Sequence, residues 1–302
     1  MKLRFTSWWR LLFLLALTLS LLLGQVSVIK AQSLKPSQLV QQGVEEYQSQ
    51  QYRQAIDSWN KALTTYKETG DLTSTVIVLE NLARAYQKIG QTETAIAFWQ
   101  EVGDNYTQLG DIQNLARSLT EQAQAYSRLG QHRQAITLLC QGRGEWHSPK
   151  EPLKCQAGSA IALAQQQEDR LAEVSALGSL GETYRLRGNY KQALTYLQNS
   201  LKLAKTINNP HLEISALNSL GNTYSSLAQV NYRRGSSAER RGEIYGENSL
   251  LAQYTREGRK QDDRALKYFQ QSLQLATAQQ NPLSEIKAII SSLPIYYRLE
   301  QY

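Results

Sequence analysis

The chain has 302 residues, 41% of them apolar, so it is long enough for a large core and is not disordered by composition. Its formal net charge of +7 would suit a nucleic-acid ligand, but four of the bases lie in residues 1–31, which contain no acid. The other 29 basic and 26 acidic side chains nearly balance. A balanced surface attracts a polyanion weakly, so the composition argues against nucleic-acid binding.

The N-terminus has the order of an export signal. Three bases lie in the first ten residues, an uncharged apolar run covers residues 11–23, and small and polar residues follow up to Ala31. This order predicts a signal peptide over residues 1–31, with cleavage after Ala31. The alternative is an uncleaved membrane anchor, because the 19 residues from 11 to 29 are about the minimum that spans a bilayer. Both interpretations place the rest of the chain outside the cytoplasm.

A tyrosine, a glycine, an alanine and a bulky apolar residue recur along the chain at fixed spacing. A looser copy, with Gly43, Tyr47, Tyr52, Ala55 and Trp59, comes first. The regular copies are Tyr86-x3-Gly90-x4-Ala95-x3-Trp99, Tyr126-x3-Gly130-x4-Ala135-x3-Leu139 and Tyr184-x3-Gly188-x4-Ala193-x3-Leu197.

Each copy predicts two antiparallel helices. The apolar residues before each tyrosine fall on one face of a helix, and the glycine ends that helix in a left-handed cap. The alanine lets the second helix approach closely, and the bulky residue one turn later fills the remaining gap. Gly-Asp pairs at 70–71 and 110–111 end one hairpin and begin the next, with Asp as the N-cap.

These lines resemble the tetratricopeptide repeat, in a variety with a period of about 40 residues found in many bacterial multi-repeat proteins. The resemblance covers roughly residues 36–302. It implies an all-α, right-handed superhelical solenoid of antiparallel helix hairpins that binds a protein or peptide. We expect repeats 1–3 over 36–140, an inserted loop and helix over 141–167, and repeats 4–6 over 168–302.

The first insertion lies between the only two cysteines, Cys140 and Cys155. In an exported protein, such a pair favours a disulfide that closes the insertion. The alternative is two buried free thiols. A helix is expected over 154–167, after a loop that contains two glycines and two prolines.

The second insertion, at about 230–262, is polar and carries seven bases and five acids. It is either an arm that contacts a partner, or a solvated helical extension or mobile loop. Residues 286–297 then repeat the apolar stripe of a first helix, so we expect the last repeat to be incomplete. Exported long-period repeats of this kind look similar to the N-terminal arms of bacterial, especially cyanobacterial, proteins that carry a caspase-like CHAT domain.

No catalytic site is predicted. The three histidines, at 132, 147 and 211, lack a second ligand at metal spacing, and the sequence contains no phosphate-binding or dinucleotide motif. A dyad of Cys140 and His147 is the weaker alternative to the disulfide. We therefore expect a chain that is not an enzyme and that needs no cofactor or metal.

The concave face of such a stack is lined by the first helices of the hairpins. The predicted partner-binding groove comprises Tyr47, Arg84, Gln87, Arg117, Arg128, Glu182, Arg185, Asn218 and Asn222. Four of these nine residues are arginines, so the expected ligand is a peptide with some acidic character.

Three functions compete at this point. The first is an exported scaffold that holds a protein or peptide, with no nucleic-acid partner and with membrane contact only through an uncleaved signal. The second is the regulatory arm of a larger effector, for example a caspase-like CHAT protein. The third is a cell-wall binder, which needs exposed aromatic platforms.

Overall fold

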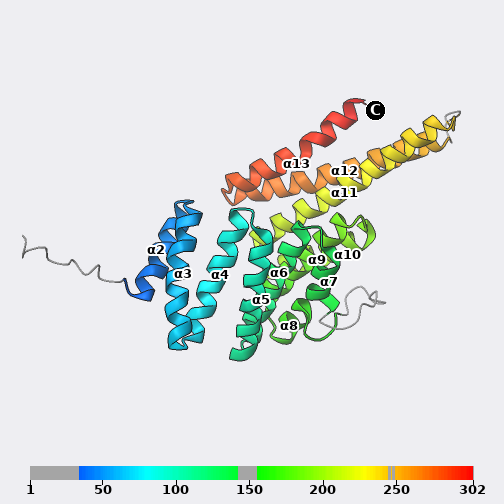
Figure 1. The fold of residues 1–302 in the computed structure, drawn as a ribbon. Helices are drawn as coiled ribbons and strands as arrows, with labels where there is room; N and C mark the ends of the chain where they lie inside the picture. The colour runs from blue at the N-terminus through cyan, green and yellow to red at the C-terminus, as the bar shows by residue number, and fades with distance from the viewer. Residues whose placement is uncertain (1–33, 142–154, 244–245, 247–248, 302) are drawn as a thin grey trace, which may run out of the picture.

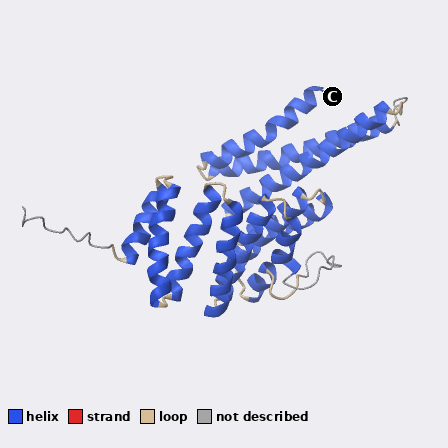
Figure 2. Cartoon of the chain, viewed as in Figure 1, coloured by secondary structure: helices blue, strands red, loops and turns tan. Residues whose placement is uncertain are grey.

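The structure is a computed structural model that describes residues 34–141, 155–243, 246 and 249–301. Its described residues form helices and turns, without a strand. The helices pair as antiparallel hairpins that stack side by side, which confirms the predicted all-α solenoid (Figures 1 and 2). The helices are α2 (Pro36–Gln48), α3 (Tyr52–Thr69), α4 (Leu72–Lys88), α5 (Thr92–Leu109), α6 (Ile112–Arg128), α7 (His132–Ile136) with a π-helical turn (Thr137–Gln141), α8 (Ala160–Gln166), α9 (Arg170–Leu186), α10 (Tyr190–Thr206), α11 (Pro210–Arg240), α12 (Leu250–Ala278) and α13 (Pro282–Gln301).

The turns between hairpins follow the predicted chemistry. Gly70 ends α3 at a φ of +72°, and the Asp71 side chain accepts a hydrogen bond from the Ser74 N–H of α4. Gly110 and Asp111 repeat the arrangement between α5 and α6. A left-handed residue followed by a side-chain cap turns the chain within two residues, and this sets the antiparallel spacing of the stack.

Small residues on the first helix of a hairpin receive a large side chain from the second. A Cβ atom on Gly43 would lie 2.3 Å from Trp59, and one on Gly221 would lie 2.6 Å from Phe269. The tyrosine of the repeat then stacks on a ring of the second helix, as Tyr184 does on Tyr196 at 5.5 Å between centroids. These contacts bury the faces that the apolar periodicity predicts.

The first insertion differs from the prediction. The expected helix over 154–167 is wrong in its N-terminal part, because α8 begins only at Ala160. Residues 155–159 form a turn in which Gly158 has a φ of +80° and the Gln156 N–H donates to the Cys140 carbonyl. Cys140 and Cys155 are joined in a disulfide, which ties this turn to the end of the π-helical segment.

The second insertion is built into the helices that flank it. Residues 230–240 continue α11 and residues 250–262 continue α12, so the two helices form a long hairpin beyond the stack (Figure 1). The pair stays close because Gly258 leaves room for the Tyr232 ring, which would lie 2.8 Å from an added Cβ. The described part of the insertion is therefore a helical extension.

Two groups of predictions concern residues outside the described part of the chain. The signal peptide over 1–31 is one, and the loop around His147 is the other. Among the helices that the structure does describe, none combines the length and the hydropathy needed to cross a membrane.

The close helix contact predicts different effects for two glycines of α9. A Cβ at position 181 would lie 2.6 Å from Leu197 Cγ and 3.2 Å from the Ala193 carbonyl oxygen. Gly181→Ala is therefore expected to lower the free energy of unfolding by about 1–3 kcal/mol. This is measured by urea denaturation of the purified chain.

Gly178→Ala is the matched control in the same helix. Its Cβ would meet only Ser200 Oγ, at 3.4 Å. Alanine favours a helix over glycine by up to about 1 kcal/mol, so this variant should be unchanged or slightly more stable. Equal destabilisation by both substitutions would contradict the proposed role of Gly181.

Candidate binding groove

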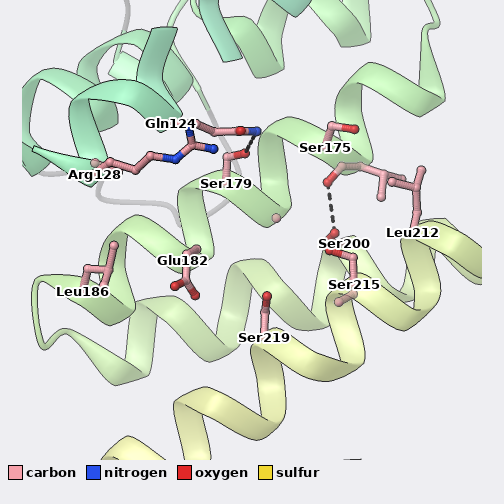
Figure 3. Close-up of a pocket in the computed structure, with 14 residues that line it drawn as sticks. Gln124, Arg128, Ser175, Ser179, Glu182, Leu186, Ser200, Leu212, Ser215 and Ser219 are labelled. Atoms are coloured by element: carbon pink, nitrogen blue, oxygen red, sulfur yellow. Dashed lines mark hydrogen bonds between the residues drawn. The ribbon is translucent and has the colours of Figure 1, made fainter. Parts of the chain in front are cut away.

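A pocket of about 450 Å³ opens on the face formed by the first helices α6, α9 and α11 (Figure 3). Its sides are Gln124 and Arg128 from α6, Ser175 and Ser179 from α9, and Ser215 from α11, each pointing into the space between the helices (Figure 3). Six of the fourteen lining residues are serines: Ser127, Ser175, Ser179, Ser200, Ser215 and Ser219. The groove is thus lined in large part by serine hydroxyls.

Some of these hydroxyls are used within the fold. Gln124 donates to the Ser179 hydroxyl at 3.0 Å, and the Ser200 hydroxyl donates to the Val174 carbonyl at 3.0 Å (Figure 3). Within the described part of the chain, the hydroxyls of Ser215 and Ser219 make no hydrogen bond. A hydroxyl both donates and accepts, so these two serines suit a ligand main chain.

The charged end of the groove contains Arg128 and Glu182. Glu182 accepts two hydrogen bonds from Arg185, the shorter at 2.6 Å, and Arg185 also reaches the Ser226 hydroxyl at 3.3 Å. Arg128 is exposed and forms no ion pair with the acids that the structure describes. It is therefore the groove cation that remains open to a ligand.

The other predicted arginines are already occupied. Arg84 pairs with Glu80 at 2.9 Å and lies over the Trp99 ring, 5.3 Å from its centroid. Arg117 pairs with Asp169 at 2.7 Å. Together with Arg185, which pairs with Glu182, three of the four predicted arginines are therefore in internal ion pairs.

A half-buried acid, Glu121 on α6, also lies near two arginines of this face and lowers its positive potential. Burial raises the pKa of the Glu121 carboxyl on α6, while Arg84 and Arg128 lower it and Glu80 raises it. The negative charge of such a carboxylate offsets part of the positive electrostatic potential of the arginines beside it. The face is accordingly more neutral than the arginine count in the sequence implies.

The remaining predicted groove residues lie outside the pocket lining. Tyr47 packs on the rings of Tyr52 and Trp59, at 5.2 and 5.8 Å between centroids. Gln87 and Asn222 are half-buried, and Asn218 is buried with 2% exposure. Of the nine predicted residues, Arg128 and Glu182 line the pocket together.

Sequence reasoning missed the serines. Serines at 175 and 179, and at 215 and 219, are each four residues apart on a first helix. That spacing places each pair on one helical face, next to the apolar stripe. A polar face of small residues beside an apolar stripe is the signal that points to a groove.

The ion pair of Arg117 and Asp169 fixes α6 against α9 next to the groove. Burial alone would raise the pKa of the Asp169 carboxyl, but bonds from the Ala172 N–H, Gln113 and Arg117 hold it below its usual value. The Asp169 side chain is 5% exposed, whereas Arg117 is 47% exposed. The carboxylate therefore caps α9 and joins it to the neighbouring hairpin.

The part of the chain that the structure describes contains no group of three His, Cys, Asp or Glu side chains placed to hold a metal ion. The arrangement of the groove offers hydrogen bonds and one open cation. It is suited to binding.

Asp169→Asn tests the electrostatic link between α6 and α9. Asparagine can still cap α9 but carries no charge. We therefore expect the free energy of unfolding at pH 7 to fall by about 1–2 kcal/mol. This range is kept low because Arg117 is partly exposed and solvent screens the ion pair. A lowered pKa gives stability that is present above the ordinary carboxyl value of 3.8 and is lost as the pH falls through the folded-state pKa. The difference between the variant and the wild type should therefore vanish in acid, as measured by thermal unfolding across pH.

Asp71→Asn is the control, because Asp71 is an exposed cap that accepts from the Ser74 N–H. Hydrogen bonds from Ser74 lower the pKa of Asp71 as well, so this variant should also lose some stability at neutral pH. The loss should be smaller than for Asp169→Asn, because Asp71 forms no ion pair with the bases that the structure describes. A difference for Asp169→Asn that persists unchanged at low pH would contradict the assignment to the charge.

Comparisons with known proteins agree with this architecture. Residues 78–108 and 172–231 each match a model of the tetratricopeptide repeat. The fold is similar to that of a Rap protein in complex with competence and sporulation factor, with a TM-score of 0.50 and 17% identity over 87% of this chain and 75% of that chain. A Podosopora anserina kinesin light chain with nearly identical TPR-like repeats gives a TM-score of 0.50 and 18% identity over 76% and 98% of the two chains. No curated protein sequence matches significantly.

Proposed function

We propose that this chain, a tetratricopeptide-repeat protein, is an exported scaffold that binds an extended peptide segment of a partner between α6, α9 and α11 and carries out no catalysis. The observation that carries the proposal is the groove, with its row of serine hydroxyls and the open Arg128 at one end. A stack of hairpins holds such a groove rigidly, so a peptide is ordered without reorganisation of the site.

The ligand is expected to be mostly neutral, with one acidic group. Hydroxyls of Ser215 and Ser219 and the amide of Gln124 match main-chain carbonyls and N–H groups. Arg128 offers one carboxylate a charged hydrogen bond, while Arg84, Arg117 and Arg185 are held by their own acids. The similar Rap protein was crystallised with competence and sporulation factor, which supports a ligand-holding role for this architecture.

The groove is tested with displayed random peptides selected on the purified chain. Ser215→Tyr places a ring in the groove from an exposed position on α11 and should weaken the selected peptides at least about tenfold, or about 1.4 kcal/mol. Arg128→Glu should weaken peptides that contain an acid and spare those that do not. Affinities are measured by fluorescence anisotropy.

Gln198→Tyr, at an exposed position on α10 outside the pocket lining, is the matched control and should leave binding unchanged. Equal binding by wild type and Ser215→Tyr, with equal melting temperatures, would place the peptide elsewhere. Failure to select any peptide above an unrelated helical protein would count against the proposed function.

Export is supported by the order of residues 1–31 and by the disulfide between Cys140 and Cys155. Such bonds persist in oxidising compartments, whereas cytosolic thiols are kept reduced. The bond closes a loop with a sequence separation of 15, which corresponds to about 3 kcal/mol of stability in the chain-entropy model.

We expect the exported chain to begin at Gln32 and to carry an intact disulfide, as measured by mass spectrometry of the intact protein without reduction. The same chain without residues 1–31, made in a reducing cytosol, should contain two thiols and should unfold with about 3 kcal/mol less free energy. An N-terminus that begins at Met1 in the membrane fraction would support the anchor instead. A wild-type chain found reduced in the cytosol would contradict export.

A further inference from the structure

The terminal helix α13 carries a large apolar face that other helices leave uncovered. It packs on α12 and α11 through one side, where Ala288 and Ile295 are buried. The opposite side exposes seven large apolar residues, by 46% to 80%: Leu283, Ile286, Ile289, Ile290, Leu293, Tyr296 and Tyr297. Figure 1 shows α13 at the outer edge of the stack.

The exposed area is large for a soluble surface. Five of the seven residues are Leu or Ile, so at about 150 Å² for each side chain, the low end of the aromatic range, these exposed fractions amount to roughly 600 Å². The largest apolar patch of an ordinary monomer is about 300–600 Å². A standard protein interface buries about 800 Å² on each partner, of which about 65% is apolar in homodimers, so this one face has the apolar area that a stable association needs.

The helix is also held in a fixed position. Arg298 of α13 pairs with the fully buried Asp262 of α12 at 2.5 Å and donates to the Ser225 hydroxyl of α11 at 2.8 Å. A buried pair with several hydrogen bonds has one preferred geometry. The apolar face is therefore presented in a defined direction.

The exposed face of α13 lacks the small residue that receives the second helix in the earlier repeats. The first helices of the earlier hairpins carry a small residue three or four positions before the tyrosine: Gly43, Ala83, Ala123, Gly181 and Gly221. Gly43, Gly181 and Gly221 are where the bulky side chain of the second helix enters. At the corresponding position, three residues before Tyr297, α13 has the exposed Pro294 in place of Gly or Ala.

The apolar stripe is nearly symmetric about its centre. Relative to Ile290, its main residues lie at −7, −4, 0, +3 and +7: Leu283, Ile286, Ile290, Leu293 and Tyr297. If a second α13 is laid antiparallel across it, Leu283 meets the partner's Tyr297, Ile286 meets the partner's Leu293, and Ile290 meets its own copy. Such a self-complementary pattern is what a twofold axis requires.

We infer that two copies of this chain pair through α13, with the helices antiparallel and Ile290 near the twofold axis. The pairing covers the patch with the same patch of the second copy. No residue of α13 lines the groove between α6, α9 and α11, so the pairing is tested independently of the proposed peptide binding.

The mass of the purified full chain, measured by light scattering and sedimentation, tests this inference. The wild type is expected to be a dimer. Ile290→Glu should give a monomer with an unchanged helical circular dichroism spectrum, because the side chain is 59% exposed in the single chain and a charge there opposes only the pairing. Ile77→Glu, which changes an isoleucine with 49% exposure on α4, should remain a dimer.

A thiol at the same position tests the register without disturbing the surface. The sequence contains only the two cysteines that form the disulfide, so Ile290→Cys adds a single free thiol. Mild oxidation should link it to its own copy and double the mass on a non-reducing gel, whereas Ile77→Cys should not be linked. A monomeric wild type, or a dimer that survives Ile290→Glu, would overturn the inference.

Discussion

The close approach of the two helices within each hairpin is the constraint on which the rest of the structure depends. Gly181 and Gly221 allow this approach, because Leu197 and Phe269 occupy the space where a Cβ would lie. Once the two axes are this close, the tyrosine of the first helix stacks on the second helix, as Tyr224 does on Tyr268. These contacts fix the geometry within each hairpin, and the Gly-Asp turns then set how one hairpin follows the next.

The fold was largely predictable because its determinants are local. Gly70 and Asp71 end one hairpin and begin the next through interactions within a few residues, and such interactions are visible as short motifs. The turn at 155–159 was not predictable. The Cys140 carbonyl and the disulfide hold it in place, and both are contacts between segments that lie apart in the sequence.

The candidate site was less predictable because charge in a sequence does not show its partner. Arg117 looks like a ligand for an acid, yet Asp169, 52 positions later, already accepts its hydrogen bonds. Only the folded stack shows that Arg128 is left without such an acid among the described residues. The serines at 215 and 219 line a groove only because α6 and α9 lie opposite them, and a single sequence does not show which helices are neighbours.

The hairpin of α11 and α12 shows how this architecture tolerates growth. Residues 230–240 and 250–262 lengthen both helices at the end where they turn, so the start of α11 and the end of α12 keep their places in the stack. Adding or removing whole helical turns beyond Tyr232 and Gly258 alters the reach of the hairpin, while Asp262 stays in place to hold Arg298 of α13. The length of this projection can therefore change at little cost to the repeats on either side.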